Sequence, residues 1–174
     1  MNKFANYRRD NIIVLIIFSA MFFVMQAAAK PLNVASLKPL RVIHDVSNQE
    51  TFKAEEGRLV SVTMIFQPDC SWCKKQGKTL AKAFEQCHSS ININLVGAKG
   101  KTRQLKKELK HYHQGIPAYK ADRQFLRSIG GYQASPTTLI YDHNGKLIAK
   151  KRGFIPKEKL ANAFSVLTQG QCQI

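Results

Sequence analysis

The sequence is poor in acidic residues, in cysteine and in repeated segments. Its 174 residues contain 11 Asp and Glu against 27 Lys and Arg, so the formal net charge is +16 and the folded surface must be strongly basic. Such a surface favours acidic partners or anionic membrane faces. Four cysteines are too few for a scaffold held mainly by disulfides, and no internal repeat or low-complexity tract is present. An apolar content of 44% is instead normal for one globular domain with its own core.

Aromatic residues are missing from the most basic stretch of the chain, at 99–110. Proteins that bind single-stranded nucleic acid combine basic groups with aromatic rings on which bases stack. We therefore expect no nucleic-acid partner and interpret the stretch as a solvated helix face. Its basic residues are Lys99, Lys101, Arg103, Lys106, Lys107 and Lys110.

The N-terminal segment has the three parts of a secretory signal peptide. Basic residues come first, an apolar run follows at 12–25, and small residues stand at Ala27 and Ala29. We expect cleavage after Ala29, which leaves residues 30–174 as a periplasmic domain. The alternative is an uncleaved membrane anchor facing the periplasm, because 11–29 is 19 residues long and a bilayer core needs about 20. Either location outside the cytoplasm permits disulfides.

Apolar patterns in the first half of the mature chain predict strands around one long helix. The segment at 40–46 is typical of a peripheral strand, and 59–66 has apolar residues on both alternating faces, as in a buried central strand. One apolar stripe runs along an amphipathic helix at 71–87, and 91–98 alternates as a further strand. These segments predict two parallel strands joined by a right-handed helical crossover.

The second half predicts two helices, a hairpin and a last helix. The two helices are marked by Leu105, Leu109 and Tyr112 and by Phe125, Leu126 and Ile129, and the hairpin turns at Asn144 and Gly145. Pro156 opens the last helix, which ends at Gly170. The order β, β, α, β, α, α, β, β, α predicts an α/β fold with a central mixed sheet and helices on both faces.

Two cysteines in "IFQPDCSWC" lie where the buried strand gives way to the helix. Cys70 would begin the helix, where unpaired N–H groups and the helix dipole stabilise a thiolate relative to a free thiol with a pKa of about 8.5. Cys73 would lie one turn further in, facing the sheet and shielded from bulk thiols. The pattern predicts Cys70 as nucleophile and Cys73 as the thiol that resolves a mixed disulfide.

Three segments, "IFQPDCSWC", "SPTTLIYDHNGKLI" and "KRGFIPKEKL", resemble the thioredoxin superfamily, and most of all its extracytoplasmic TlpA and ResA type of thiol-disulfide oxidoreductase. The resemblance covers roughly 40–167, and the connection at 99–134 matches that branch's longer one. It implies a thioredoxin-like fold and an enzyme with no cofactor beyond a redox-active Cys70–Cys73 disulfide. Its partners would be protein thiols and disulfides of the cell envelope, with an upstream membrane or periplasmic thiol donor.

The resemblance also implies a substrate-binding loop around Pro136. The matching proline is cis in the family and packs against the cysteines, while the backbone of the preceding residue, here Ser135, pairs with an incoming peptide. Trp72 and Thr137 complete the expected substrate-binding residues. The alternative is a plain strand-leading proline, since only about 5% of X-Pro bonds are cis.

The redox direction depends on residues around the pair. The family often has an acidic residue behind the cysteines, whereas Met64 and Gln76 stand at the corresponding positions here. Asp69 opposes thiolate formation, the two lysines after Cys73 favour it, and no His lies between the cysteines. We therefore favour a reductase acting on secreted or envelope proteins. The alternative is an interaction module of an envelope or secretion assembly, in which the pair is a mere crosslink.

A metal site is disfavoured by spacing. His111 and His113 could join Cys70 and Cys73 as four zinc ligands, but a single residue between the two histidines does not match the usual spacing. Copper delivery would require cysteines separated by three residues and a suitably placed His. No bound metal is expected.

The thioredoxin arrangement also predicts a structural disulfide between Cys87 and Cys172. In that arrangement the helix beginning at the cysteine pair ends at the pole opposite the active edge, and the last helix returns to the same pole on the same face of the sheet. The alternative is a buried free thiol at Cys87 and a loose tail thiol at Cys172, because sequence alone does not fix connectivity.

Overall fold

The computed structural model describes residues 37–41 and 59–174. The expected signal segment at 1–29 and most of the expected strand at 40–46 lie outside the described residues. Among the residues described, no helix is both long and apolar enough to cross a membrane.

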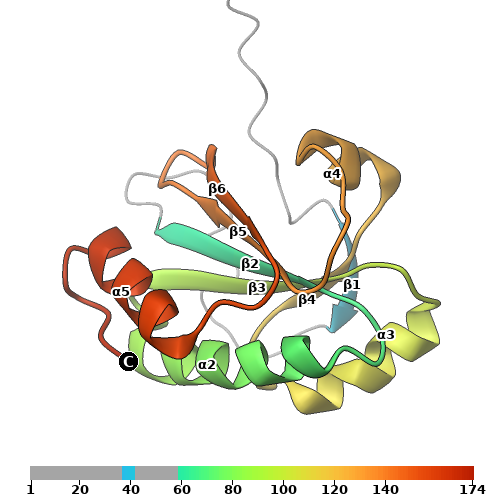
Figure 1. Ribbon diagram of the computed structural model, residues 1–174, viewed down its shortest axis with the longest axis horizontal. Coiled ribbons are helices and arrows are strands. Elements are labelled where there is room, and N and C mark those ends of the chain that lie inside the picture. The colour runs from blue at the N-terminus through green and yellow to red at the C-terminus, as the bar shows by residue number, and fades with distance from the viewer. Residues whose placement is uncertain (1–36, 42–58) are drawn as a thin grey trace, which may run out of the picture. The chain divides into compact units, whose positions relative to one another are not determined.

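A six-stranded mixed sheet in the order β1-β4-β3-β2-β5-β6 forms the centre of the fold (Figure 1). β2 lies in the middle, where it pairs parallel with β3 and antiparallel with β5. The expected α/β class and mixed sheet are therefore confirmed. The strands are β1 Lys38–Arg41, β2 Val60–Phe66, β3 Ile91–Gly97, β4 Ala118–Lys120, β5 Thr137–Tyr141 and β6 Leu147–Arg152.

Helices cover both faces of this sheet. Figure 1 shows α2 and α5 on one face and α4 on the other, and each face has its own apolar cluster. Met64 on β2 points into the cluster under α2, whereas its neighbour Ile65 points into the cluster under α4. This double burial explains the unbroken apolar run of the strand. The helices are α2 Ser71–Cys87, α3 Thr102–Glu108, α4 Arg123–Ser128 and α5 Lys157–Leu167, with a 3-10 turn at Leu109–His111.

One strand is absent from the sequence-based order. β4 lies between the two helices expected within 99–134, where it pairs parallel with β3 and antiparallel with β1. Three residues are too few to show a period of two, so the local pattern does not reveal it. Its place is fixed by pairing, with Ala118 opposite Leu95 of β3.

Candidate active site

The first cysteine pair lies at the start of α2, directly after the central strand. Cys70 is the residue that caps the helix, and its Sγ accepts a hydrogen bond from the backbone N–H of Cys73 at 3.1 Å. The two form a disulfide with an S–S distance of 1.99 Å. Cys70 is 8% exposed and Cys73 is fully buried, so Cys70 is the more accessible residue of the pair.

The proline loop begins β5. The Ser135–Pro136 peptide bond is cis, and Thr137 Oγ1 donates a hydrogen bond to Ala134 O at 2.6 Å. The carbonyl of Pro136 accepts from Gly153 N at 2.8 Å, which ties this loop to the segment after β6.

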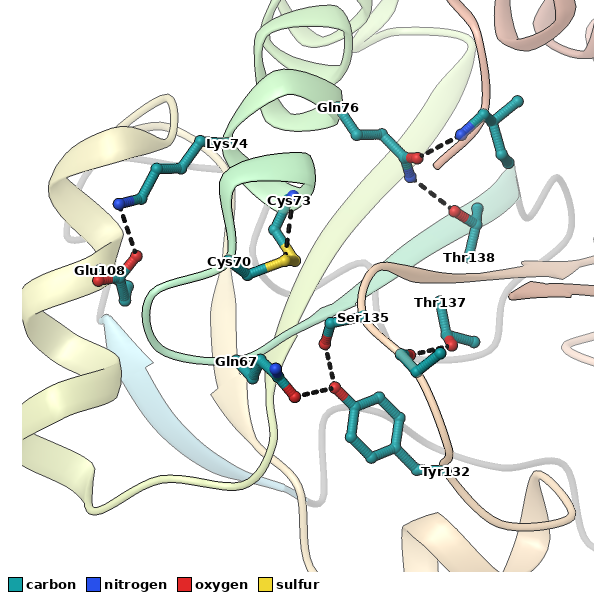
Figure 2. Close-up of a disulfide and its surroundings, with 12 residues drawn as sticks. Gln67, Cys70, Cys73, Lys74, Gln76, Glu108, Tyr132, Ser135, Thr137 and Thr138 are labelled. Atoms are coloured by element: carbon teal, nitrogen blue, oxygen red, sulfur yellow. Dashed lines mark hydrogen bonds and ion pairs between the residues drawn. A yellow bond between two sulfur atoms is a disulfide. The ribbon is translucent and has the colours of Figure 1, made fainter. Parts of the chain in front are cut away.

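Tyr132 joins the proline loop to the cysteine loop, although no sequence motif marks it as a site residue. Tyr132 O–H donates to Gln67 Oε1 at 3.1 Å, and its oxygen is hydrogen-bonded to the Ser135 hydroxyl (Figure 2). Gln67 comes three residues before Cys70. Burial raises the pKa of Tyr132 above its ordinary value, with the Ser135 hydrogen bond acting in the opposite direction. The phenol therefore stays neutral near pH 7 and can serve both hydrogen bonds.

Trp72, between the cysteines, is 54% exposed. Its ring centroid lies 5.1 Å from that of Phe154, which follows β6. Lys75 Nζ lies over both rings, 5.3 Å from the Trp72 centroid and 4.9 Å from the Phe154 centroid. The sequence marked Trp72 as a site residue but gave no signal that Phe154 would lie beside it.

Gln76 connects three elements behind the disulfide. It is fully buried, its Nε2 donates to Thr138 Oγ1 at 2.7 Å, and its Oε1 accepts from Ile155 N at 2.9 Å (Figure 2). An amide supplies the donor and the acceptor that these two partners require. The sequence drew attention to Gln76 because the family often has an acid there, and its hydrogen bonds give the amide a structural role.

A buried carboxylate was missed at the sequence level. Glu108, at the end of α3, is only 6% exposed, and its Oε2 lies 3.6 Å from Lys74 Nζ (Figure 2). That oxygen has no hydrogen-bond partner among the described residues. Burial raises the pKa of Tyr112, and the negative charge of Glu108 raises it further. The basic residues of 99–110 are exposed as expected, while Glu108 belongs to the inward face of the same helix.

The second cysteine pair lies at the other end of α2. Cys87 and Cys172 form a disulfide with an S–S distance of 2.11 Å, the pairing that the thioredoxin arrangement predicts. Cys87 is 2% exposed and Cys172 is fully buried in the cluster that also contains Leu160 and Phe164 of α5. The bond therefore joins the end of α2 to the segment after α5.

The two candidate zinc histidines do not join the cysteines. Within 37–41 and 59–174, no three His, Cys, Asp or Glu side chains gather as a metal site. His113 Nε2 lies 3.6 Å from Glu85 Oε1, and His111 is exposed.

The fold and the disulfide at the head of α2 define a thiol-disulfide oxidoreductase with a thioredoxin-like fold, the class that the sequence predicts. The profile of the thioredoxin-like domain family matches residues 47–167, and the chain belongs to that family. No curated protein matches the sequence significantly.

Several solved structures share the fold. Mycobacterium tuberculosis DsbF is 17% identical with a TM-score of 0.59, and the match covers 76% of this chain and 93% of that one. A secreted M. tuberculosis disulfide oxidoreductase homologous to E. coli DsbE is 10% identical with a TM-score of 0.53, covering 63% and 82%. The exposed lipoprotein thioredoxin of Streptococcus pneumoniae is 17% identical with a TM-score of 0.55, covering 63% and 85%. At these identities the likeness concerns the fold.

Proposed function

We propose that the protein is an extracytoplasmic reductase that transfers electrons from its Cys70–Cys73 dithiol to disulfides of secreted or envelope proteins. The observation that carries the proposal is the asymmetry of the pair. Cys70 caps α2 and is slightly exposed, whereas Cys73 is fully buried one turn further in. One sulfur is thus suited to attack a partner and the other to resolve the product.

The proposed reaction has two exchange steps. The Cys70 thiolate attacks one sulfur of the substrate disulfide, forms a mixed disulfide and releases the other substrate sulfur as a thiolate, which takes up a proton. The Cys73 thiol then loses its proton and attacks Cys70 Sγ, which closes the internal disulfide and releases the second substrate sulfur as a thiolate that takes up a proton. Two electrons pass to the substrate, and an upstream dithiol donor in the membrane or periplasm restores the reduced pair.

The substrate segment would lie against the proline loop and the exposed ring between the cysteines. The proposed substrate-binding residues of this loop are Pro136 and its neighbours Ser135 and Thr137. The backbone of Ser135 would pair with the backbone of the substrate. Support comes from Tyr132, whose hydrogen bonds link Ser135 to Gln67 in the loop that leads to Cys70. Trp72 lies between the two cysteines and is 54% exposed, so its ring offers the substrate an apolar surface.

The reductase direction rests on the modest stabilisation available to the Cys70 thiolate. The described donor to its sulfur is the N–H of Cys73 at 3.1 Å, the intervening residues include no His, and Asp69 precedes it. We expect the pKa of reduced Cys70 to lie near the value of about 7 found in thioredoxin and not near the roughly 3.5 of a strong oxidant. Titration of thiolate absorbance tests this, and a thiolate that persists below about pH 5 would refute the reductase assignment.

The extracytoplasmic location rests on the N-terminal pattern, and two proteins of similar fold are described as secreted and as an exposed lipoprotein. Cleavage after Ala29 would release residues 30–174 into the periplasm. An uncleaved segment would instead hold the domain at the membrane, facing the periplasm. N-terminal sequencing of protein from the cell envelope separates the two, with Lys30 expected as the first residue.

Trapping of mixed disulfides tests the function itself. A Cys73→Ala variant should accumulate mixed disulfides with envelope proteins through Cys70, because the resolving step is removed. The matched Cys70→Ala variant should accumulate few, because its remaining Cys73 is buried. Trapping that runs mainly through Cys87 or Cys172 would show the assignment of the reactive pair to be wrong.

A further inference from the structure

Trp72, an expected substrate-binding residue, forms one surface with Lys75 and Phe154, which no sequence motif marks. Trp72 and Lys75 come from the first turn and a half of α2, and Phe154 comes from the segment after β6. The two rings lie 5.1 Å apart between centroids, and Lys75 Nζ lies within 5.3 Å of both centroids. Trp72 is 54% exposed, and Lys75 is exposed as well. We name these three residues the aromatic–lysine platform.

Hydrogen bonds on both sides of Phe154 hold its segment in place. Gln76, fully buried, accepts from the N–H of Ile155, the residue after Phe154, and donates to Thr138 on β5. On the other side of Phe154, the N–H of Gly153 donates to Pro136 O at 2.8 Å. The segment that carries Phe154 is thus tied to α2 and to the proline loop, so that little conformational freedom is lost when a partner binds.

The chemistry of the platform fits an apolar side chain next to a carboxylate. The rings offer apolar surface, and the ammonium group of Lys75, which lies over both of them, offers a charge partner. Lys151 and Arg152, both exposed at the end of β6, add positive charge in the segment that leads to Phe154. Asp69, next to Cys70 in the chain, is exposed and carries the opposite charge, against the three basic side chains of these segments.

We propose that the aromatic–lysine platform determines substrate specificity and selects partner proteins in which an apolar residue and an acidic residue stand beside the reacting cysteine. The proposal rests on the proposed function, because only a substrate bonded to Cys70 brings its flanking residues to Trp72. The partner is thereby defined by chemistry: an apolar and acidic segment next to a disulfide.

Disulfide-bonded peptides that differ only beside the reacting cysteine provide the test. One carries Phe-Glu, one Phe-Lys and one Ser-Lys, and the second-order rate constant for reduction of each by the full reduced protein is measured. We expect the Phe-Glu peptide to react about five-fold faster than the Phe-Lys peptide, the most that one exposed ion pair commonly contributes. The Phe-Lys peptide should in turn react faster than the Ser-Lys peptide.

Two charge reversals on α2 separate the platform from the general basicity of the protein. Lys75→Glu should abolish or invert the preference for Glu over Lys in the peptide. Lys82→Glu makes the same change in net charge at an exposed position about 10 Å further along the helix. It should leave the preference near that of the unmodified protein at 0.15 M salt, where the Debye length is about 8 Å. Equal losses in both variants would overturn the proposal, as would an unmodified protein without preference.

The aromatic part of the platform has its own pair of variants. Phe154→Ala should reduce the preference for Phe over Ser in the peptide, and Phe154→Tyr should restore it. A preference that survives in Phe154→Ala would overturn the proposal for this side chain. Failure of the unmodified protein to reduce any of the three peptides would instead refute the proposed function, and the specificity assignment would fall with it.

Discussion

The bond between Cys87 and Cys172 should supply a large part of the stability of the fold. The cleanest perturbation is reduction of this bond in a Cys70→Ala, Cys73→Ala background, where no other disulfide can form. Oxidised and reduced protein then differ only in the crosslink and share every side chain in the buried cluster. Buried thiols pack much as small apolar groups do, so the comparison leaves the core filled.

The size of the effect follows from the length of chain that the bond encloses. The two cysteines are separated by 85 positions, for which the loop-entropy relation gives a stabilisation of about 4.6 kcal/mol. Measured losses on removing native disulfides commonly lie between about 2 and 5 kcal/mol. A domain has a total free energy of unfolding of roughly 5–15 kcal/mol, so reduction should remove a substantial fraction of it.

Urea unfolding followed by circular dichroism measures the effect, with the free energy of unfolding extrapolated to water for each form. We expect the reduced form to unfold at a clearly lower urea concentration. Peptide mapping without reductant must first show the bond in the oxidised sample. A difference below about 1 kcal/mol between forms verified in this way would refute the argument from loop entropy, and free thiols in natively oxidised protein would refute the bond.

Three further outcomes are expected. Gly77→Ala should lower the free energy of unfolding by about 1–3 kcal/mol, because the new Cβ would lie 2.5 Å from the Tyr112 ring; an unchanged urea midpoint would contradict this close packing. Tyr132→Phe should cost about 1 kcal/mol and slow peptide reduction, because it removes the link between Gln67 and Ser135; unchanged rates would exclude a positioning role. The pKa of Tyr112 is raised in the folded state, so the folded protein holds the phenol proton more tightly than the unfolded chain does. The free energy of unfolding should therefore fall as pH rises beyond about 10, the pKa of an unfolded tyrosine. Ultraviolet titration of Tyr112→Phe against the unmodified protein should assign a late tyrosinate to this residue, and an ordinary pKa would show that its ring is hydrated.

Local patterns were sufficient for the elements that are long or sharply bounded. The expected helix at 71–87 has the bounds of α2, because its apolar stripe is continuous and Cys70 caps it. The central strand was recognisable because both of its faces are buried, which leaves an uninterrupted apolar run. The directions of the two helices in the thioredoxin arrangement were then enough to predict that Cys87 lies close to Cys172.

The remaining features depend on contacts between distant segments. Gln76 meets Thr138 across 62 positions, and Tyr132 meets Gln67 across 65, so no local pattern marks either pair. Glu108 is different, since its spacing of three from Leu105 places it on the inward face of the helix. That spacing could have revealed that Glu108 is buried, but the lysines around it favoured the prediction of a fully solvated segment.

Helix α2 also bears on how the cysteines find their partners while the exported chain folds. Cys87 and Cys172 are 85 positions apart in sequence, so their contact needs both ends of the domain to be in place. Before that contact forms, Cys87 could pair wrongly with Cys73, which is much nearer in sequence. The 14 positions between these two (87 minus 73) span about 21 Å once the helix has formed, and cysteines whose Cα atoms are more than about 7 Å apart do not bond. Early formation of α2 would thus hold these two cysteines too far apart to mispair while the chain folds.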